Sequence, residues 1–298
     1  MSRPRPLIEW PTLVLLILAY GAFALGTTVL AELWLPLALA VTVLAIVLHS
    51  SLTHEVVHGH PFRSQMLSEI TVFPVLGLFI PYLRFKDTHL LHHTDSKLTD
   101  PYDDPESNYL DPKVWGRLPF LARLALRVNN TLIGRIVLGP AIGQLCFMSC
   151  DARAIWAGDR RVLLGWALHV PAMMLVFWWV TQSAMPIWAY LLCAYVAFGI
   201  LKIRTFLEHQ AHETYRGRTV IVEDRGPLAW LFLYNSLHVV HHMHPKLPWY
   251  RLPVVFDDNR DRYLGRNGGY YFRSYWEIFR SFALRAKDPV PHPLWPKD

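Results

Sequence analysis

Long apolar segments alternate with polar ones along this 298-residue chain. A helix needs about 20 mostly apolar residues to cross a lipid bilayer. Four segments, nearly free of charged residues, meet this requirement, at about 10–30, 33–53, 163–182 and 186–203. We therefore predict an all-α membrane protein with four transmembrane helices. Residues 54–160 and 204–298 would form a helical cap, and residues 1–298 a single integral membrane domain.

Two other apolar stretches have features that argue against a full crossing. Residues 67–83 are interrupted by Pro74 and Pro81, so we expect a partly inserted hairpin there. Residues 131–150 contain Arg135 and several glycines. We expect this second stretch to form a helix that lies in the membrane interface.

Positive charges flank the four predicted spans asymmetrically. Cytoplasmic loops of membrane proteins carry an excess of Lys and Arg. The turns at 26–32 and 181–185 contain neither residue, whereas basic residues stand on the other side of the spans: Arg3, Arg5, Arg153, Arg160, Arg161, Lys202 and Arg204. This predicts that both termini and the cap are cytoplasmic, and we expect a bacterial inner membrane. The asymmetry and anionic lipid account for the net charge of +6 without nucleic acid.

Histidines gather in three clusters outside the centres of the spans. On a helix, residues three or four positions apart share a face. Within each cluster the later histidines stand three or four positions after the first, and this holds for eight residues: His54, His58, His89, His92, His93, His238, His241 and His242. So many imidazoles would repel one another if several became charged, and a bound cation removes that cost. Since one structural zinc takes only four ligands, eight nitrogens predict two ions, although imidazole alone does not distinguish iron, zinc, copper and nickel.

A further histidine pair, His209 and His212, follows the fourth span, and we favour His209 as a ninth ligand because it is nearer the membrane end of its segment. The second nitrogen of a metal-bound histidine usually bonds a carboxylate or carbonyl. The run 100–106 is rich in acids, although a solvated loop would have the same composition. Further ligands or hydrogen-bonding partners of ligands are expected among His60, His212, His244, Asn235, Glu55, Asp87, Asp100, Asp104 and Glu208.

The histidine pattern resembles that of the membrane fatty acid desaturase and hydroxylase superfamily. That pattern is H-x(3,4)-H followed by two H-x(2,3)-H-H motifs, and the segments Asp100–Glu106 and Pro248–Pro253 are also similar to those of the family. The resemblance implies a di-iron site, four spans, and the use of molecular oxygen to attack an unactivated C–H bond. It also implies an external electron donor, of ferredoxin or cytochrome type, with its reductase.

The sequence contains no electron-carrier motif of its own. It has no haem-binding motif, no Gly-rich dinucleotide loop and no Cys-x-x-Cys pair, and the three cysteines, Cys146, Cys150 and Cys193, are expected to be buried thiols. Basic residues in 117–135 and 251–280 are expected to meet an acidic carrier.

Three functions fit the sequence, in descending order. The first is an acyl-lipid desaturase acting on a lipid or fatty acyl chain. The second is a lipid or carotenoid hydroxylase or ketolase with the same site. The third is a metal transporter, which is disfavoured because its ligands should lie at membrane depth, whereas these histidines follow the ends of spans or lie in loops.

Overall fold

The structure, a computed structural model, describes residues 7–295. Arg3 and Arg5, which contribute to the predicted orientation, lie outside the described residues. The chain divides into two compact units. The first comprises the residues up to Lys86 together with Gln144–Phe198, and the second comprises Asp87–Gly143 and the residues from Gly199 onward. Both units are mostly helical, as predicted.

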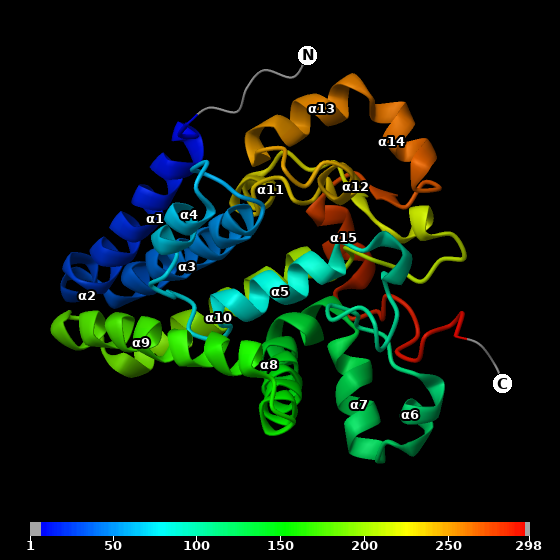
Figure 1. The fold of residues 1–298 in the computed structure, drawn as a ribbon, viewed down its shortest axis with the longest axis horizontal. Helices are drawn as coiled ribbons and strands as arrows, with labels where there is room; N and C mark the ends of the chain where they lie inside the picture. The colour runs from blue at the N-terminus through cyan, green and yellow to red at the C-terminus, as the bar shows by residue number, and fades with distance from the viewer. Residues whose placement is uncertain (1–6, 296–298) are drawn as a thin grey trace. The chain divides into compact units, whose positions relative to one another are not determined.

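The first unit is built on two long apolar helices, α1 and α3, which lie side by side (Figure 1). A proline in the first turn begins each of them, where its missing N–H costs no hydrogen bond. Gly26 of α1 lies against Thr42 of α3, and this brings the two backbones close together. The helices wholly in this unit are α1 (Trp10–Thr27), α2 (Val29–Leu33), α3 (Leu35–Val57), α4 (Gln65–Thr71) and α9 (Arg160–Gln182).

Three helices contain the points where the chain passes from one unit to the other: α5 (Tyr82–His92), α8 (Leu132–Trp156) and α10 (Ile187–Thr205). Within the second unit, α8 and α10 approach closely, since Gly199 lies against the backbone of Ile136. Small residues permit such contacts between apolar helices.

The second unit is otherwise made of short elements. Its helices are α6 (Pro112–Arg117), α7 (Phe120–Asn129), α11 (Pro227–Leu231), α12 (His238–Met243), α13 (Leu252–Asp258), α14 (Arg260–Arg266) and α15 (Tyr275–Phe282). The 3-10 turns are η1 (Asp95–Lys97), η2 (Tyr215–Arg218) and η3 (Trp249–Arg251). Strands β1 (Ile221–Val222) and β2 (Tyr271–Phe272) pair in parallel, with Ile221 opposite Tyr271.

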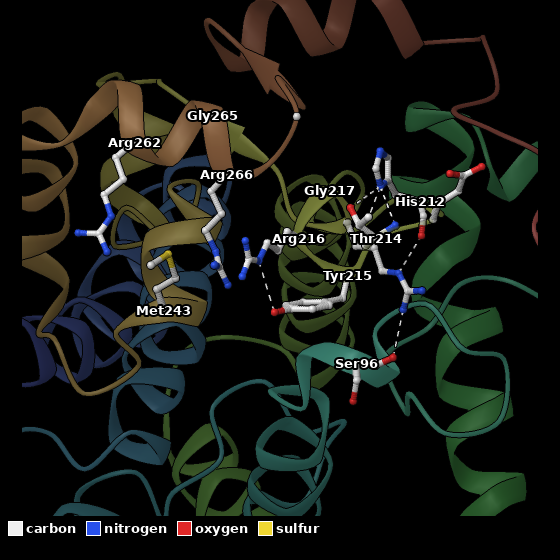
Figure 2. Close-up of a pocket in the computed structure, with 13 residues that line it drawn as sticks. Ser96, His212, Thr214, Tyr215, Arg216, Gly217, Met243, Arg262, Gly265 and Arg266 are labelled. Atoms are coloured by element: carbon white, nitrogen blue, oxygen red, sulfur yellow. Dashed lines mark hydrogen bonds between the residues drawn. The ribbon is translucent and has the colours of Figure 1, made fainter.

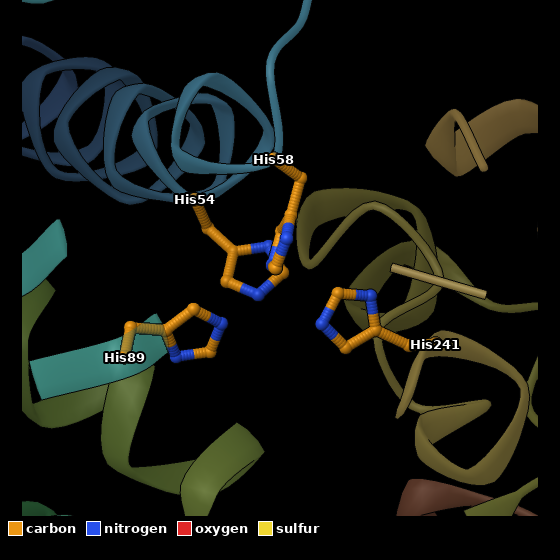
Figure 3. Close-up of side chains that lie close together, drawn as sticks. All are labelled: His54, His58, His89 and His241. Carbon is orange, nitrogen blue, oxygen red and sulfur yellow. The ribbon is translucent and has the colours of Figure 1, made fainter. Parts of the chain in front are cut away.

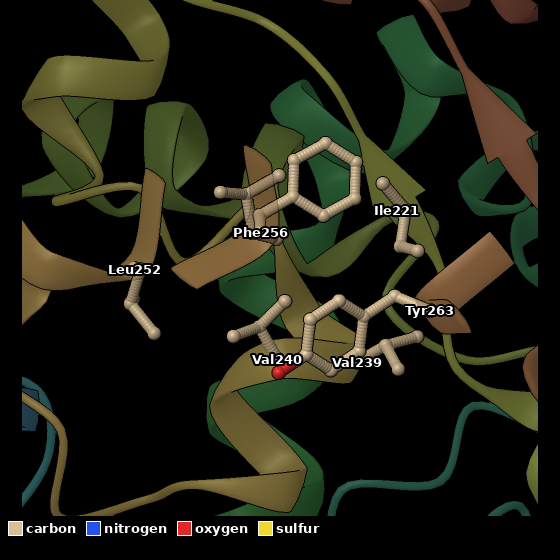
Figure 4. Packing of buried hydrophobic residues seen from close by; sticks show 7 residues of the cluster. Ile221, Val239, Val240, Leu252, Phe256 and Tyr263 are labelled. Atoms are coloured by element: carbon tan, nitrogen blue, oxygen red, sulfur yellow. The ribbon is translucent and has the colours of Figure 1, made fainter. Parts of the chain in front are cut away.

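A compact apolar core lies beneath α12 in the second unit. Val239 and Val240 of α12 pack there with Ile221, Phe256 and Tyr263 (Figure 4). All five side chains are buried. This core fixes one face of α12 and leaves its histidines on the other side of the helix.

Within residues 7–295, five segments are long and apolar enough to cross a membrane: Trp10–Leu33, Leu35–Val57, Leu132–Trp156, Arg160–Gln182 and Ile187–Thr205. Four of them correspond to the predicted spans. The fifth is α8, which was expected to lie in the interface, so the predicted count of four is not confirmed. The stretch 67–83, predicted to be a hairpin, holds the end of α4, an irregular segment and the start of α5.

Candidate metal centre

Four histidines of the second unit converge on one point. His92 ends α5, His238 and His242 lie on α12, and His209 follows α10. One nitrogen of each lies within 4.8 Å of the others. Nε2 of His209 is 2.9 Å from Nε2 of His92 and 3.2 Å from Nε2 of His238. We call these residues the four-histidine group.

Backbone hydrogen bonds to Val220, the residue before strand β1, position both His209 and α12. The amide of Val220 donates to the carbonyl of Glu208, and the amide of Val239 donates to the carbonyl of Val220. The segment that carries His209 and the helix that carries His238 are thus attached to one stretch of backbone. This explains how histidines 29 positions apart in the chain come into contact.

The other ring nitrogen of three of these histidines faces an oxygen. His92 Nδ1 is 2.8 Å from Oδ1 of Asp104, and His238 Nδ1 is 3.1 Å from Oδ1 of Asn235. His209 Nδ1 is 3.4 Å from the hydroxyl of Thr219. When Nδ1–H donates to such an oxygen, the lone pair lies on Nε2, which is the arrangement that metal-bound histidines require.

A second set of histidines in the same unit consists of His89, His93 and His241. Nε2 of His93 lies 3.0 Å from Nε2 of His89 and 3.1 Å from Nε2 of His241. Nδ1 of His89 is 3.0 Å from a carboxylate oxygen of Glu106. The rings of His89 and His241 are stacked, with centroids 6.2 Å apart (Figure 3).

His54 and His58 belong to the first unit, at the end of α3. Their spacing of four brings both rings to the same side of the helix, with centroids 4.9 Å apart (Figure 3). Both residues are buried. Glu55, between them in sequence, is buried too, and its carboxylate lies 3.7 Å from His54 Nδ1.

The pKa values of the histidines in the four-histidine group favour the binding of a metal cation. Burial lowers the pKa of His209 and His238 well below the usual value, so both are neutral near pH 7. Burial alone would also lower the pKa of His92, but Glu106 and Asp104 outweigh it and raise the pKa to about 9. The same carboxylates would stabilise a bound metal ion in place of that proton.

The donor set fits a transition-metal ion. Histidine nitrogens that bind one ion at about 2.1 Å are separated from each other by roughly 3.0–3.4 Å, depending on the coordination geometry. The Nε2 separations of 2.9–3.2 Å in both sets are close to this range. Neutral imidazoles with an anchored second nitrogen are ligands for iron, zinc, copper or nickel.

Of the acidic and amide residues predicted to support the histidines, Asp104 and Asn235 lie within hydrogen-bonding distance of a histidine nitrogen, and Glu55 lies 3.7 Å from one. Glu208 Oε1 lies 4.0 Å from His238 Nδ1. The same carboxylate accepts a hydrogen bond from Asn235 Nδ2 at 3.3 Å and lies 3.2 Å from Arg204 Nε. Burial raises the pKa of Glu208. Asp100 instead accepts hydrogen bonds from the next residues of its own turn, and Asp87 is half-buried on α5.

Three other predicted histidines contact other groups. His60 pairs with the buried carboxylate of Glu9. His244 lies 3.2 Å from the hydroxyl of Tyr263. His212 contacts the backbone and hydroxyl of Thr214 in its own turn. Among the described residues, these three are not part of either histidine set.

Sequence reasoning did not single out Glu106 or Thr219. In the sequence, Glu106 is one of several acidic residues in segment 100–106. Its position two residues after Asp104 is the one sequence feature that could have pointed to it. Thr219 had no such feature, because it reaches His209 through a backbone bridge between distant segments. The prediction for the cysteines was wrong in part: Cys193 is buried, but Cys146 and Cys150 are exposed on α8.

Comparison with known proteins is consistent with this geometry. The family model for fatty acid desaturases matches residues 32–275. The chain is also 25% identical over 215 residues to a beta-carotene ketolase from Paracoccus sp. (strain PC1), a match that covers 70% of this chain and 72% of the ketolase.

Proposed function

The chain belongs to the fatty acid desaturase family, and from this premise we propose that it introduces a C=C double bond into a lipid acyl chain, with two iron ions and molecular oxygen. The coarser assignment, a membrane-bound di-iron oxidoreductase acting on a lipid or carotenoid, follows from the family and the ketolase relative. The observation that carries the proposal is the four-histidine group, in which three Nδ1 atoms face oxygens.

We assign the ligands to two ions. One ion would be held by His92, His209, His238 and His242. The other would be held by His89, His93 and His241, and the sequence pattern supplies His54 and His58 as its remaining ligands. The preference for His209 over His212 is supported by the 2.9 Å separation of the Nε2 atoms of His209 and His92.

The residues of the chain would perform three tasks. The histidines bind the metal ions, and Asp104, Glu106 and Asn235 orient their rings and balance charge. Burial of His92 and His238 limits the access of water to the site. When bound, the iron supplies the chemistry that activates oxygen and removes hydrogen. Loss of two hydrogens from the substrate, with two electrons and two protons, converts O2 to two water molecules.

We propose that both histidine sets lie on the cytoplasmic face of a bacterial inner membrane. Their residues in the second unit lie outside all five candidate spans. The side of the membrane is inferred from the distribution of Lys and Arg, since basic residues flank the cap ends of the spans. External electron donors of ferredoxin or cytochrome type would reach the site from that side.

A ketolase or hydroxylase is the second candidate, and the beta-carotene ketolase relative favours it. Each insertion of one oxygen atom, which gives an alcohol, uses one O2, two electrons and two protons and releases one water. A ketone needs a second such insertion at the same carbon, followed by loss of one water. A metal transporter has less support, because the histidines of both sets in the second unit lie outside the candidate spans.

Mass spectrometry of lipids and carotenoids distinguishes these functions. Cells that express the chain should contain lipids lighter by two hydrogens than those of cells that express His92→Ala. Products heavier by oxygen would favour the ketolase or hydroxylase. Identical lipids and carotenoids in both strains, with iron present in the purified protein, would contradict both assignments.

A further inference from the structure

An arginine-lined depression opens on the surface of the second unit beside the four-histidine group. Its volume is about 900 Å³, and its wall is formed by the η2 segment, the end of α12 and α14 (Figure 2). Four arginines line it, namely Arg216, Arg218, Arg262 and Arg266, against one carboxylate, Glu213. The lining therefore carries a net positive charge.

The depression approaches the four-histidine group through Met243. A second, narrow cavity shares Tyr215, Arg216, Met243 and Arg266 with the depression, and it is also lined by His242. Met243 follows His242 directly in the sequence. A molecule that binds in the depression therefore contacts Met243, the residue next in sequence to the proposed iron ligand His242.

The wall is held in place from within. Arg218 donates to the backbone carbonyls of Ser96, Leu98 and His212, at 3.2, 2.7 and 3.1 Å. Its guanidinium thus ties the η2 segment to η1. Arg216 and Arg262, by contrast, are exposed at the rim, where Arg216 donates a hydrogen bond of 3.4 Å to the hydroxyl of Tyr215 (Figure 2).

We propose that this depression is the docking site for an acidic electron-carrier protein. The proposal rests on the proposed function, which needs two electrons per turnover. One electron leaves the reduced carrier and converts one iron(III) ion to iron(II), and a second carrier repeats the transfer. Positive charge at the rim attracts an acidic protein and speeds its association, and contact beside Met243 brings the carrier close to His242.

The other basic region expected from the sequence, residues 117–135, suits a carrier less well. Arg135 is buried and donates to the carbonyl of Asn129, so it is not available at the surface. Arg123 and Arg127 lie on α7, where Leu121 and Leu124 are also exposed. A helix that mixes basic and exposed apolar residues in this way suits a lipid surface. Arg123 and Arg127 of α7 therefore serve as a matched control for the arginines of the depression.

Binding measurements test the proposal. The full chain in nanodiscs of neutral phosphatidylcholine is titrated with a small acidic [2Fe–2S] ferredoxin, at low and high salt. Arg216→Glu/Arg262→Glu should weaken binding at low salt by about tenfold or more, and wild-type binding should weaken as salt rises. Arg123→Glu/Arg127→Glu should change binding less than about twofold. Unchanged iron content and melting temperature verify that each variant is folded.

Two results would overturn the docking site: wild-type affinity in Arg216→Glu/Arg262→Glu, or a loss of binding confined to Arg123→Glu/Arg127→Glu. Failure of the wild type to bind the acidic protein more tightly than a basic protein of similar size would overturn it as well. The proposed function is tested separately: the wild type is reduced with dithionite without oxygen, excess dithionite is removed, and O2 is then added for a single turnover. Absence of any desaturated or oxygenated product there would reject the proposed function, whereas the binding result judges the docking site alone.

Discussion

The ring of His92 is anchored to Asp104, with Nδ1 of the histidine 2.8 Å from Oδ1 of the carboxylate. The second oxygen of Asp104 accepts a hydrogen bond from the amide of Thr99, at 2.9 Å. Both residues are buried. The carboxylate therefore has a fixed position, and it fixes the orientation of a proposed iron ligand.

We predict that Asp104→Asn weakens iron binding by about 10- to 100-fold, the usual cost of removing a hydrogen-bonding partner from a metal-bound histidine. The measurement is iron retention after dialysis against graded concentrations of a chelator. Asp103→Asn is the control, because the Asp103 side chain is 57% exposed and lies 3.2 Å from Nζ of the exposed Lys97. Equal retention in both variants would reject this role for Asp104.

A second prediction separates His209 from His212. His209→Ala removes a nitrogen of the four-histidine group, so the protein should lose about one of the two proposed irons, because three imidazoles remain where four are proposed. His212→Ala should keep both irons, since His212 bonds within its own turn. Metal analysis of the two purified variants measures the iron content of each. Loss of iron from His212→Ala alone would reverse the assignment.

The histidine groups could be proposed from the sequence because helical spacing and the number of histidines are local properties. The sequence could not choose between His209 and His212 with certainty, since both have the same spacing and similar neighbours. The choice depends on the backbone bridge between His209 and Thr219, which joins segments separated in the chain. Glu106 was missed for a similar reason, because only the fold of the loop directs one acid of the run toward His89.

Packing of α1 against α3 leads to a third prediction. A Cβ at Gly26 would lie 2.5 Å from Oγ1 and 3.3 Å from the backbone nitrogen of Thr42, so Gly26→Ala should destabilise the protein by about 1–3 kcal/mol. Gly21 lies on the same helix with nothing within 4 Å of its added Cβ, so Gly21→Ala should cost little. Thermal unfolding in detergent compares them. Equal stability would show that α1 and α3 do not pack as described.

An ion pair with a buried carboxylate provides the fourth prediction. Arg84 binds Asp151 through two hydrogen bonds, of 2.9 and 2.8 Å, and Trp166 donates to the same carboxylate. Arg84→Ala leaves Asp151 buried without its counterion and should destabilise the protein by about 3–5 kcal/mol. Lys97→Ala removes an exposed ion pair and should cost less than about 1 kcal/mol. Chemical denaturation measures both, and similar losses would contradict the importance of burial.

The last prediction concerns α8, whose length and composition permit a crossing. Three candidate spans, α8, α9 and α10, separate His92 from His209 in the chain, yet the Nε2 atoms of these residues are 2.9 Å apart. An odd number of crossings would put the two histidines on opposite sides of the membrane. We therefore predict that α8, which contains the buried Arg135 and Asp151, does not cross fully.

Cysteine labelling tests the topology of α8. In a background that lacks the three native cysteines, Val128→Cys and Trp156→Cys flank this helix, and both positions are exposed. A membrane-impermeant maleimide should label both from the same side of sealed vesicles. Arg160→Cys and Ser183→Cys, at the two ends of α9, should be labelled from opposite sides and serve as the control. Labelling of the α8 pair from opposite sides would require α9 or α10 to be the helix that fails to cross, because the contact between His92 and His209 permits only an even number.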